Sequence, residues 1–167
     1  EPVVLEYSFF VAGHTYGASG VDNAGLHPPM EAKFDFMKSD SLMQLGVLTG
    51  DIVISGTNQN WDEVDASLAL LEMPVYFAAG NHDLTDRPLY ESRYGSTYYS
   101  FEEHGDLFIV LDPGLDLWNI SGDQFIFLQN TLNQKAANVK NIYVFFHQLL
   151  WWSPDNIYKN VKANSVA

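Results

Sequence analysis

The sequence has no cysteine among its 167 residues, which excludes disulfide bridges, thiolate metal sites and cysteine nucleophiles. It also lacks an apolar run long enough to cross a bilayer. The longest apolar stretches, such as Ile142 to Phe146, have the length of buried strands. The sequence therefore predicts no membrane span and no thiol chemistry.

Basic residues are scarce: 8 Lys and Arg stand against 21 Asp and Glu, which gives a formal net charge of −13. An acidic surface of this kind repels a phosphate backbone, so broad nucleic-acid binding is disfavoured. A small phosphate ester can still bind where bound cations reverse the local field. The acidity also fits solubility in a salty or extracytoplasmic setting.

An initiator methionine is missing, because the chain begins with Glu1-Pro2-Val3. We therefore expect a processed or trimmed chain, from which a secretory signal or an expression tag was removed. The compartment stays open, with a secreted or periplasmic location preferred to a cytoplasmic one.

The residues that are present suit one globular domain or a large piece of one. The hydrophobic fraction is 47% and the charged fraction is 17%, both ordinary for a globular chain that buries a core. The aromatic fraction of 14% is high and indicates bulky packing or a stacking surface.

Strand and helix patterns alternate along the chain. Strands are expected at residues 4–11, 47–48, 75–78, 98–102, 107–111 and 142–146. Helices are expected from Met30 through Leu45, at residues 61–71, and after a capping box of Ser121 and Gln124 as far as about Asn133. Alternation favours a largely parallel sheet, and the hairpin at residues 98–111 adds antiparallel strands. The predicted fold class is α/β (α+β), with mixed sheets flanked by helices.

Polar residues stand just past the ends of the predicted strands: His14, Asp51, Asn81 with His82, and His147. Ligands gather at the carboxyl ends of strands in open α/β sheets, so these side chains could converge. Imidazole, carboxylate and amide oxygen suit Zn, Mn or Fe rather than Ca. Two such ions about 3.5–4 Å apart can hold both oxygens of an in-line displacement at phosphorus and supply a hydroxide nucleophile near neutral pH.

The spacing of these residues resembles that of the calcineurin-like metallophosphoesterases. Leu48-Thr-Gly-Asp51 followed by Ala79-Gly-Asn-His-Asp83 is similar to the second and third motifs of that family, with one helix and one strand between them. Val144-Phe-Phe-His147 is similar to the fourth motif. The resemblance implies a sandwich of mixed sheets flanked by helices, and a metal-dependent hydrolase of small phosphate esters.

The resemblance also implies a role for each matching residue. Asp51 would bridge two divalent ions (Mn, Fe, Zn or similar; one or two), and Asn81 and His147 would bind the second. His82 would lie beside the phosphate, where it stabilises developing charge or protonates the leaving oxygen. Asp83 would orient His82.

Two departures from the family pattern bear on the first metal and on the length of the chain. The first motif of the family is Asp-x-His, and this chain has Ala12-Gly13-His14, so His14 is in register but the carboxylate is missing. An alternative register, Gly13-His-Thr15, loses both ligands. The fifth motif, Gly-His-x-His, has no match, and its expected place lies beyond Ala167. Residues 1–167 are therefore expected to be a single domain, incomplete at its C-terminal end, from a longer chain.

Two other functions stay open. A degenerate member of the family could keep one metal or none and serve as a binding or scaffold module, which Ala12 and the missing fifth motif favour. A carbohydrate or protein interaction domain is the other, suggested by the aromatic content and by Trp151-Trp152.

Overall fold

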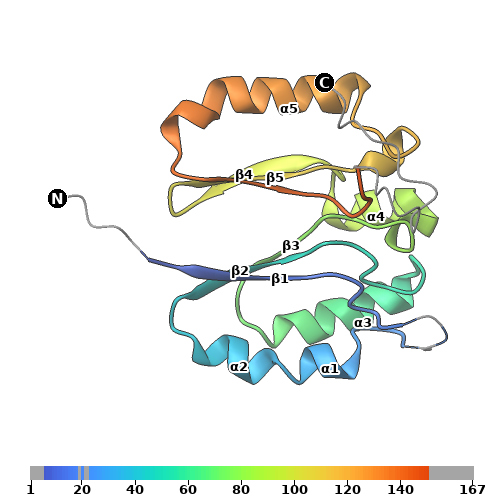
Figure 1. Cartoon of the computed structure of the whole chain (residues 1–167). Helices are drawn as coiled ribbons and strands as arrows, with labels where there is room; N and C mark the ends of the chain where they lie inside the picture. The colour runs from blue at the N-terminus through green and yellow to red at the C-terminus, as the bar shows by residue number, and fades with distance from the viewer. Residues whose placement is uncertain (1–5, 19, 21–22, 151–167) are drawn as a thin grey trace, which may run out of the picture. The chain divides into compact units, whose positions relative to one another are not determined.

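The computed structural model describes residues 6–18, 20 and 23–150. The chain divides into two compact units, Glu1–Gly95 and Ser96–Ala167, and each is described by itself. Figure 1 colours the first unit from blue to green and the second from yellow to red.

The first unit contains a three-stranded parallel sheet. Its strands are β1 (Ser8–Ala12), β2 (Met43–Leu48) and β3 (Val75–Phe77), in the order β1-β2-β3. Ala12 pairs with Leu48, and Leu48 pairs with Phe77, so the carboxyl ends of the three strands are level. The first strand was predicted at residues 4–11, and residues 4 and 5 lie outside the part of the chain that the structure describes.

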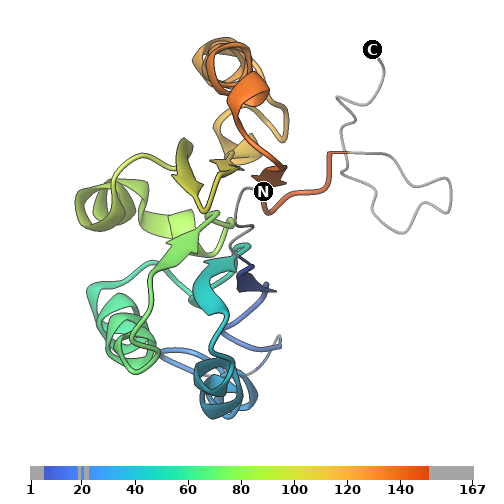
Figure 2. The same cartoon turned by 90° about the vertical axis from the view of Figure 1, so that its left-hand side faces the viewer.

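Three helices cover one face of this sheet: α1 (Pro28–Glu31), α2 (Phe34–Ser39) and α3 (Asn58–Ala69) (Figures 1 and 2). The side chain of Thr57 accepts a hydrogen bond from the backbone N–H of Asn60 at 3.2 Å, which caps the start of α3. The buried core between helices and sheet is formed by side chains that include Phe10, Phe34, Met37, Leu48, Trp61, Val64, Leu68 and Phe77.

The predicted helix that ran from Met30 through Leu45 is wrong in its second half. Helix α2 ends at Ser39, and Leu45 lies in β2. Asp40 makes the break, because its carboxylate accepts a hydrogen bond from the backbone N–H of Leu42 at 2.9 Å. This local contact offers the backbone an alternative to another helical turn.

A 3₁₀ helix, η1 (Asp83–Asp86), and a further helix, α4 (Arg87–Tyr94), follow β3 and were not predicted. The Asp86 carboxylate caps α4 by accepting from the Leu89 N–H at 3.0 Å. Tyr90 and Tyr94 of α4 both pack edge-on against Trp61 of α3, with ring centroids 5.6 and 5.0 Å from that ring. Part of the high aromatic content therefore lies in this core.

The second unit contains a mixed three-stranded sheet of β4 (Tyr99–Glu103), β5 (Asp106–Val110) and β6 (Ile142–Phe145). Strands β4 and β5 form the predicted antiparallel hairpin, and β6 pairs parallel with β5. His104 and Gly105 at the hairpin turn have φ angles of 51° and 84°, the backbone of a tight two-residue turn.

Helix α5 (Gly122–Lys135) connects β5 to β6 and covers one face of this sheet, and the short 3₁₀ helices η2 (Pro113–Leu115) and η3 (Ala136–Asn138) lie on either side of α5 in the chain (Figure 1). The helix begins where it was predicted, but the predicted capping box is wrong. The Gln124 amide instead binds the backbone of Asp112, with its Nε2 donating to the Asp112 carbonyl at 2.9 Å. The Ser121 hydroxyl donates to the Asp116 carboxylate.

The predicted α/β class is confirmed, because the described part of the chain forms two small sheets, one parallel and one mixed, each flanked by helices. Within residues 6–18, 20 and 23–150, no helix combines the length and apolar character needed to cross a membrane.

Candidate metal centre

The loops that follow β1, β2 and β3 meet at the carboxyl edge of the parallel sheet. The level ends of the three strands place these loops side by side. The backbone N–H of His14 donates to the Gly50 carbonyl at 3.0 Å, which ties the first loop to the second. Open α/β sheets bind their ligands at this edge.

Asp51 stands between the first and third loops. Its Oδ2 lies 3.4 Å from Nδ1 of His14, and its Oδ1 accepts a hydrogen bond from the backbone N–H of His82 at 3.3 Å. The Asp51 side chain is 4% exposed and that of His14 is 64% exposed. The two carboxylate oxygens thus face two different loops, an arrangement that suits a ligand shared between cations.

Strained backbone marks the same two loops. His14 and Asp51 have φ angles of 51° and 52°, in the left-handed region that non-glycine residues rarely adopt. Such a conformation costs about 1–3 kcal/mol per residue and persists only where neighbouring contacts hold it. Two such contacts are the hydrogen bonds from the His14 N–H to the Gly50 carbonyl at 3.0 Å and from the Tyr16 N–H to the Asp51 carbonyl at 3.3 Å. Strain of this kind concentrates at functional sites.

The imidazole of His82 is fixed by a main-chain group. Its Nδ1 lies 2.8 Å from the carbonyl oxygen of Ile54. A carbonyl oxygen only accepts, so Nδ1 carries the proton in this contact. The other ring nitrogen, Nε2, is therefore the one that could act on a substrate.

Asp83 was expected to orient His82, and the structure corrects that role. The Asp83 carboxylate is fully buried and binds backbone amides, with Oδ1 accepting from Ile52 at 2.7 Å and from Val53 at 3.0 Å. Its Oδ2 accepts from Gly80 at 2.8 Å. Asp83 therefore fastens the loop that carries Asp51 to the loop that carries Asn81 and His82.

Burial shifts the acidity of this carboxyl group. Desolvation raises the pKa of Asp83 to about 6, against the three amide hydrogen bonds, which lower it. The negative charge of nearby Asp51 adds a smaller upward contribution. At pH 7 the group is mostly ionised, so both oxygens can accept from the amides.

Asn81 is exposed and follows Gly80 directly, so its backbone is held by the hydrogen bond that the Gly80 N–H donates to the Asp83 carboxylate. Ala12 ends β1 and packs against the core of the first unit, so the position of the family's first carboxylate offers no ligand atom. The remaining donors, imidazole, carboxylate and amide oxygen, fit a divalent transition-metal ion.

His147 belongs to the second unit, where it stands two residues beyond the end of β6 and is half-buried. Its position past a parallel strand agrees with the sequence. Its binding of the same metal as Asp51 stays a prediction. Trp151-Trp152, on which the interaction-domain alternative rested, lies outside the described residues.

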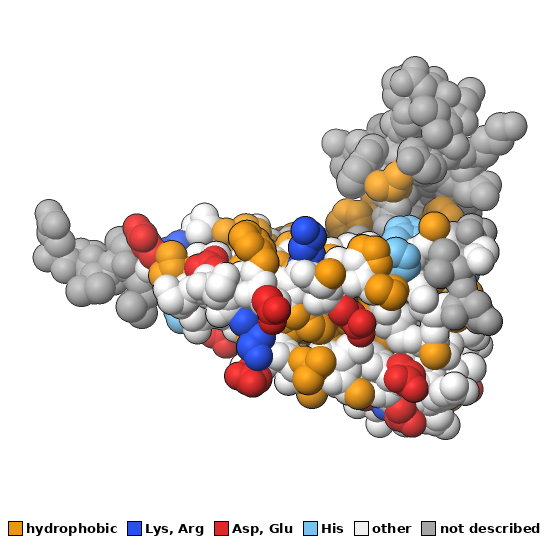
Figure 3. Space-filling view, turned by 90° about the horizontal axis from the view of Figure 1, so that it is seen from below, with side chains coloured by type: hydrophobic (Ala, Val, Ile, Leu, Met, Phe, Trp, Pro, Cys, Tyr) orange, Lys and Arg blue, Asp and Glu red, His pale blue; other side chains and the backbone are white. Residues whose placement is uncertain are grey.

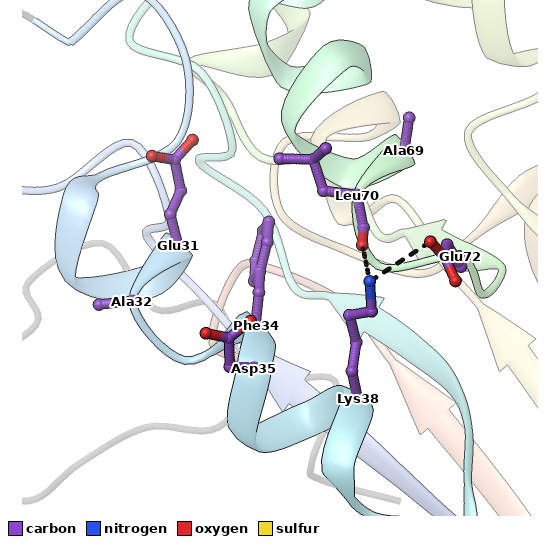
Figure 4. A pocket seen from close by; sticks show the side chains of 8 residues that line it. All are labelled: Glu31, Ala32, Phe34, Asp35, Lys38, Ala69, Leu70 and Glu72. Atoms are coloured by element: carbon purple, nitrogen blue, oxygen red, sulfur yellow. Dashed lines mark hydrogen bonds and ion pairs between the residues drawn. The ribbon is translucent and has the colours of Figure 1, made fainter.

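A surface hollow of about 450 Å³ lies elsewhere on the first unit, between α2 and the end of α3. Lys38 of α2 reaches across it to the Leu70 carbonyl at 3.0 Å and to Glu72 at 3.4 Å (Figure 4). The helix ends that line it precede β2 and β3, so the hollow is at the amino edge of the sheet. Figure 3 views this helical side, where hydrophobic side chains lie among acidic and a few basic ones. The catalytic candidates therefore lie at the opposite edge.

Sequence reasoning missed the main-chain groups of the site. The carbonyl of Ile54 and the amides of Ile52 and Val53 hold His82 and Asp83, and their residue types carry no signal of that use. The only hint was their place directly after Asp51.

Comparison with known proteins adds three findings. A family model described as calcineurin-like phosphoesterase matches residues 24–165. A protein of Arcobacter nitrofigilis described as a probable glycerophosphodiester phosphodiesterase, GpdQ, is 28% identical over 116 residues, which cover 62% of this chain and 41% of that protein. The chain thus spans about two fifths of the length of this curated relative.

The third finding is a structural likeness to the purple acid phosphatase PPD1 from seeds of yellow lupin (Lupinus luteus). The TM-score is 0.70 at 14% sequence identity, over 98% of this chain and 35% of that one. At this identity the likeness shows the fold, which is the one that the sequence resemblance implied. Because the family model covers most of the sequence, the chain belongs to the calcineurin-like phosphoesterase family.

Proposed function

We propose that this chain is a metal-dependent hydrolase of small phosphate esters. The family implies divalent metal ions and phosphoester chemistry. The observation that carries the proposal is the placing of Asp51, with one carboxylate oxygen toward the His14 ring and the other on the backbone of His82. This joins the loops of the first three motifs around one buried carboxylate.

Asp51, His14 and Asn81 hold the metal in this proposal, together with His147 of the second unit. A bound divalent ion would supply Lewis acidity at the phosphoryl oxygens and an activated water. His82 acts on the substrate through Nε2, because Ile54 occupies Nδ1. Because Nδ1 already carries a proton, donation from Nε2 requires the doubly protonated imidazolium. In that form Nε2 donates a hydrogen bond to a phosphoryl oxygen, or gives its proton to the leaving oxygen as the ester bond to phosphorus breaks, which returns the ring to the neutral form protonated at Nδ1.

The test pairs metal content with hydrolysis. The 167-residue chain is loaded with Mn²⁺ or Zn²⁺, and its metal content is measured by mass spectrometry in wild type, Asp51→Asn and Asp35→Asn. Asp35 is an exposed carboxylate of α2, so its variant is the matched control. The proposal expects only Asp51→Asn to lose metal and to lose about a hundredfold in kcat/KM. Equal metal content and equal rates in all three proteins would refute it.

The ester class is addressed with p-nitrophenyl phosphate and bis(p-nitrophenyl) phosphate. The curated relative is described as a phosphodiesterase and the structural neighbour as a phosphatase. The ratio of kcat/KM for the two compounds assigns the monoester or diester preference directly.

A second candidate function is a binding or scaffold module that keeps at most one metal. Ala12 favours it, because the end of β1 lacks the carboxylate of the family motif. Ala12→Asp would raise the number of metal ions bound per chain if that loss is what weakens the site. An unchanged metal content in Ala12→Asp would count against this candidate.

A further inference from the structure

We infer that Tyr16 is a positioning residue for His82, and this inference rests on the proposed function. The phenol ring stacks on the imidazole, with ring centroids 5.1 Å apart and the planes at 29°. Tyr16 is 5% exposed, so its ring is held within the structure rather than in solvent. Neither residue is close to the other in sequence, and they come from the loops after β1 and β3.

Tyr16 also lies beside the first imidazole of the site. Its ring centroid is 6.2 Å from that of His14, with the planes tilted at 51°. One aromatic side chain therefore contacts both the histidine predicted to bind metal and the histidine predicted to act on the phosphate. A change in the position of the Tyr16 ring would therefore alter the surroundings of both imidazole rings.

Both main-chain polar groups of Tyr16 are hydrogen-bonded. Its N–H donates to the Asp51 carbonyl at 3.3 Å, and its carbonyl accepts from the side-chain amide of Asn23 at 2.9 Å. The turn closes with a hydrogen bond from the Gly17 N–H to the His14 carbonyl at 3.0 Å. Gly17 has a φ of 112°, and a Cβ there would lie 2.6 Å from the ring of His27, so glycine is required at this point.

His82 is thus restrained in two directions. The Ile54 carbonyl at Nδ1 fixes the rotation of the ring in its own plane, and Tyr16 covers one face. Without the stacked ring, the imidazole could tilt away while keeping its hydrogen bond. A displacement of about 1 Å at a reacting group can lower a rate about a hundredfold. Tyr16 acts through His82 and needs no contact of its own with substrate.

The first test is magnetic resonance on the zinc-loaded 167-residue chain and needs no turnover. Nuclear Overhauser contacts are expected between the ring protons of Tyr16 and those of His82. Tyr16→Leu should shift the His82 ring protons by several tenths of a ppm as the ring current is lost, and Tyr16→Phe should leave them in place. Absence of the contacts in the wild-type chain would overturn the inference.

The second test is kinetic and uses p-nitrophenyl phosphate. Tyr16→Leu should lower kcat about tenfold with KM changed less than about twofold, and Tyr16→Phe should restore kcat, because one misplaced group affects the reacting geometry. Tyr90→Leu removes another buried tyrosine, packed on Trp61, and should leave kcat and the His82 resonances unchanged. An unchanged kcat in Tyr16→Leu would overturn the inference.

The two tests separate this inference from the proposed function. If the chain hydrolyses no phosphate ester but the Overhauser contacts are present, the proposed function fails and the positioning of His82 by Tyr16 stands. If the ester is hydrolysed and Tyr16→Leu leaves kcat unchanged, the positioning role fails and the proposed function stands.

Discussion

The Asp83 carboxylate binds main-chain amides instead of the side chain of its neighbour His82. The sequence Gly80-Asn-His-Asp83 suggested a carboxylate for His82, yet the carboxylate binds three amides, and a carbonyl holds the imidazole. Both arrangements fit the same residue types. The difference depends on where the loop after β2 turns, which the sequence does not encode in side-chain chemistry.

The substitution Asp83→Asn tests whether these contacts with main-chain amides stabilise the protein. The new Nδ2 would face an amide donor, either that of Gly80 or those of Ile52 and Val53, and leave it unsatisfied in a buried site. We expect a loss of about 1–3 kcal/mol in unfolding free energy. Metal affinity should fall about 10–100-fold, because the loops of Asp51 and Asn81 lose their shared anchor. Chemical denaturation and metal titration measure the two effects.

Asp86→Asn is the matched control for that variant. Asp86 also accepts from a backbone amide, but as the exposed N-cap of α4, where asparagine caps equally well. Its unfolding free energy should stay within about 0.5 kcal/mol of wild type. Equal stability in Asp83→Asn and wild type would show that the buried amide contacts contribute little.

The candidate site residues came from the sequence because histidine, aspartate and asparagine followed predicted strands. His14, Asp51 and His82 do lie together, as the parallel ends of β1, β2 and β3 require. Tyr16 gave only the weak signal of an aromatic between His14 and Gly17. Its partner His82 is 66 residues away, so the stacking could not be seen before the fold was known.

At the scale of elements, the loop after β2 packs closely on η1. The backbone N–H of Gly56 donates to the Thr85 hydroxyl at 2.7 Å, and a Cβ on Gly56 would lie 2.7 Å from the Asp83 carbonyl oxygen. That neighbour is backbone and cannot rotate away. We expect Gly56→Ala to separate the two segments and to cost about 1–3 kcal/mol in unfolding free energy.

The measurement is chemical denaturation of Gly56→Ala beside Ser55→Ala. The serine variant adds no atom and removes only a hydroxyl 3.3 Å from that of Thr85, so it should stay near wild-type stability. A Gly56→Ala protein as stable as Ser55→Ala would mean that the loop after β2 and η1 can move apart at little cost in free energy.

Element prediction succeeded where the apolar pattern was uninterrupted and failed where a local side-chain contact or a proline intervened. The hairpin of β4 and β5, the helix α5 and the strand β6 were predicted to within a few residues. The prediction that a helix continues through Asp40 was wrong, because the contact of the Asp40 side chain with the Leu42 N–H ends the helix. Helix α4 was missed, since Pro88 and its polar neighbours hide a helix that begins at an aspartate cap.

At the scale of the whole molecule, the net charge of −13 opposes the approach of an anionic ester. Added salt screens this repulsion, because the Debye length falls from about 30 Å at 0.01 M to about 8 Å at 0.15 M. We therefore expect kcat/KM for p-nitrophenyl phosphate to rise as NaCl is increased over this range, with kcat little changed. A fall in kcat/KM would indicate that the metal-loaded site attracts the substrate beyond one Debye length.

The proposed function requires that Asp51 holds a divalent metal at the carboxyl edge of the parallel sheet. An anomalous difference map from crystals grown with Zn²⁺ tests it most directly. We expect a peak about 2.0–2.2 Å from an Asp51 carboxylate oxygen. A map whose peaks lie only elsewhere, such as among the acidic side chains beside Lys38, would contradict it.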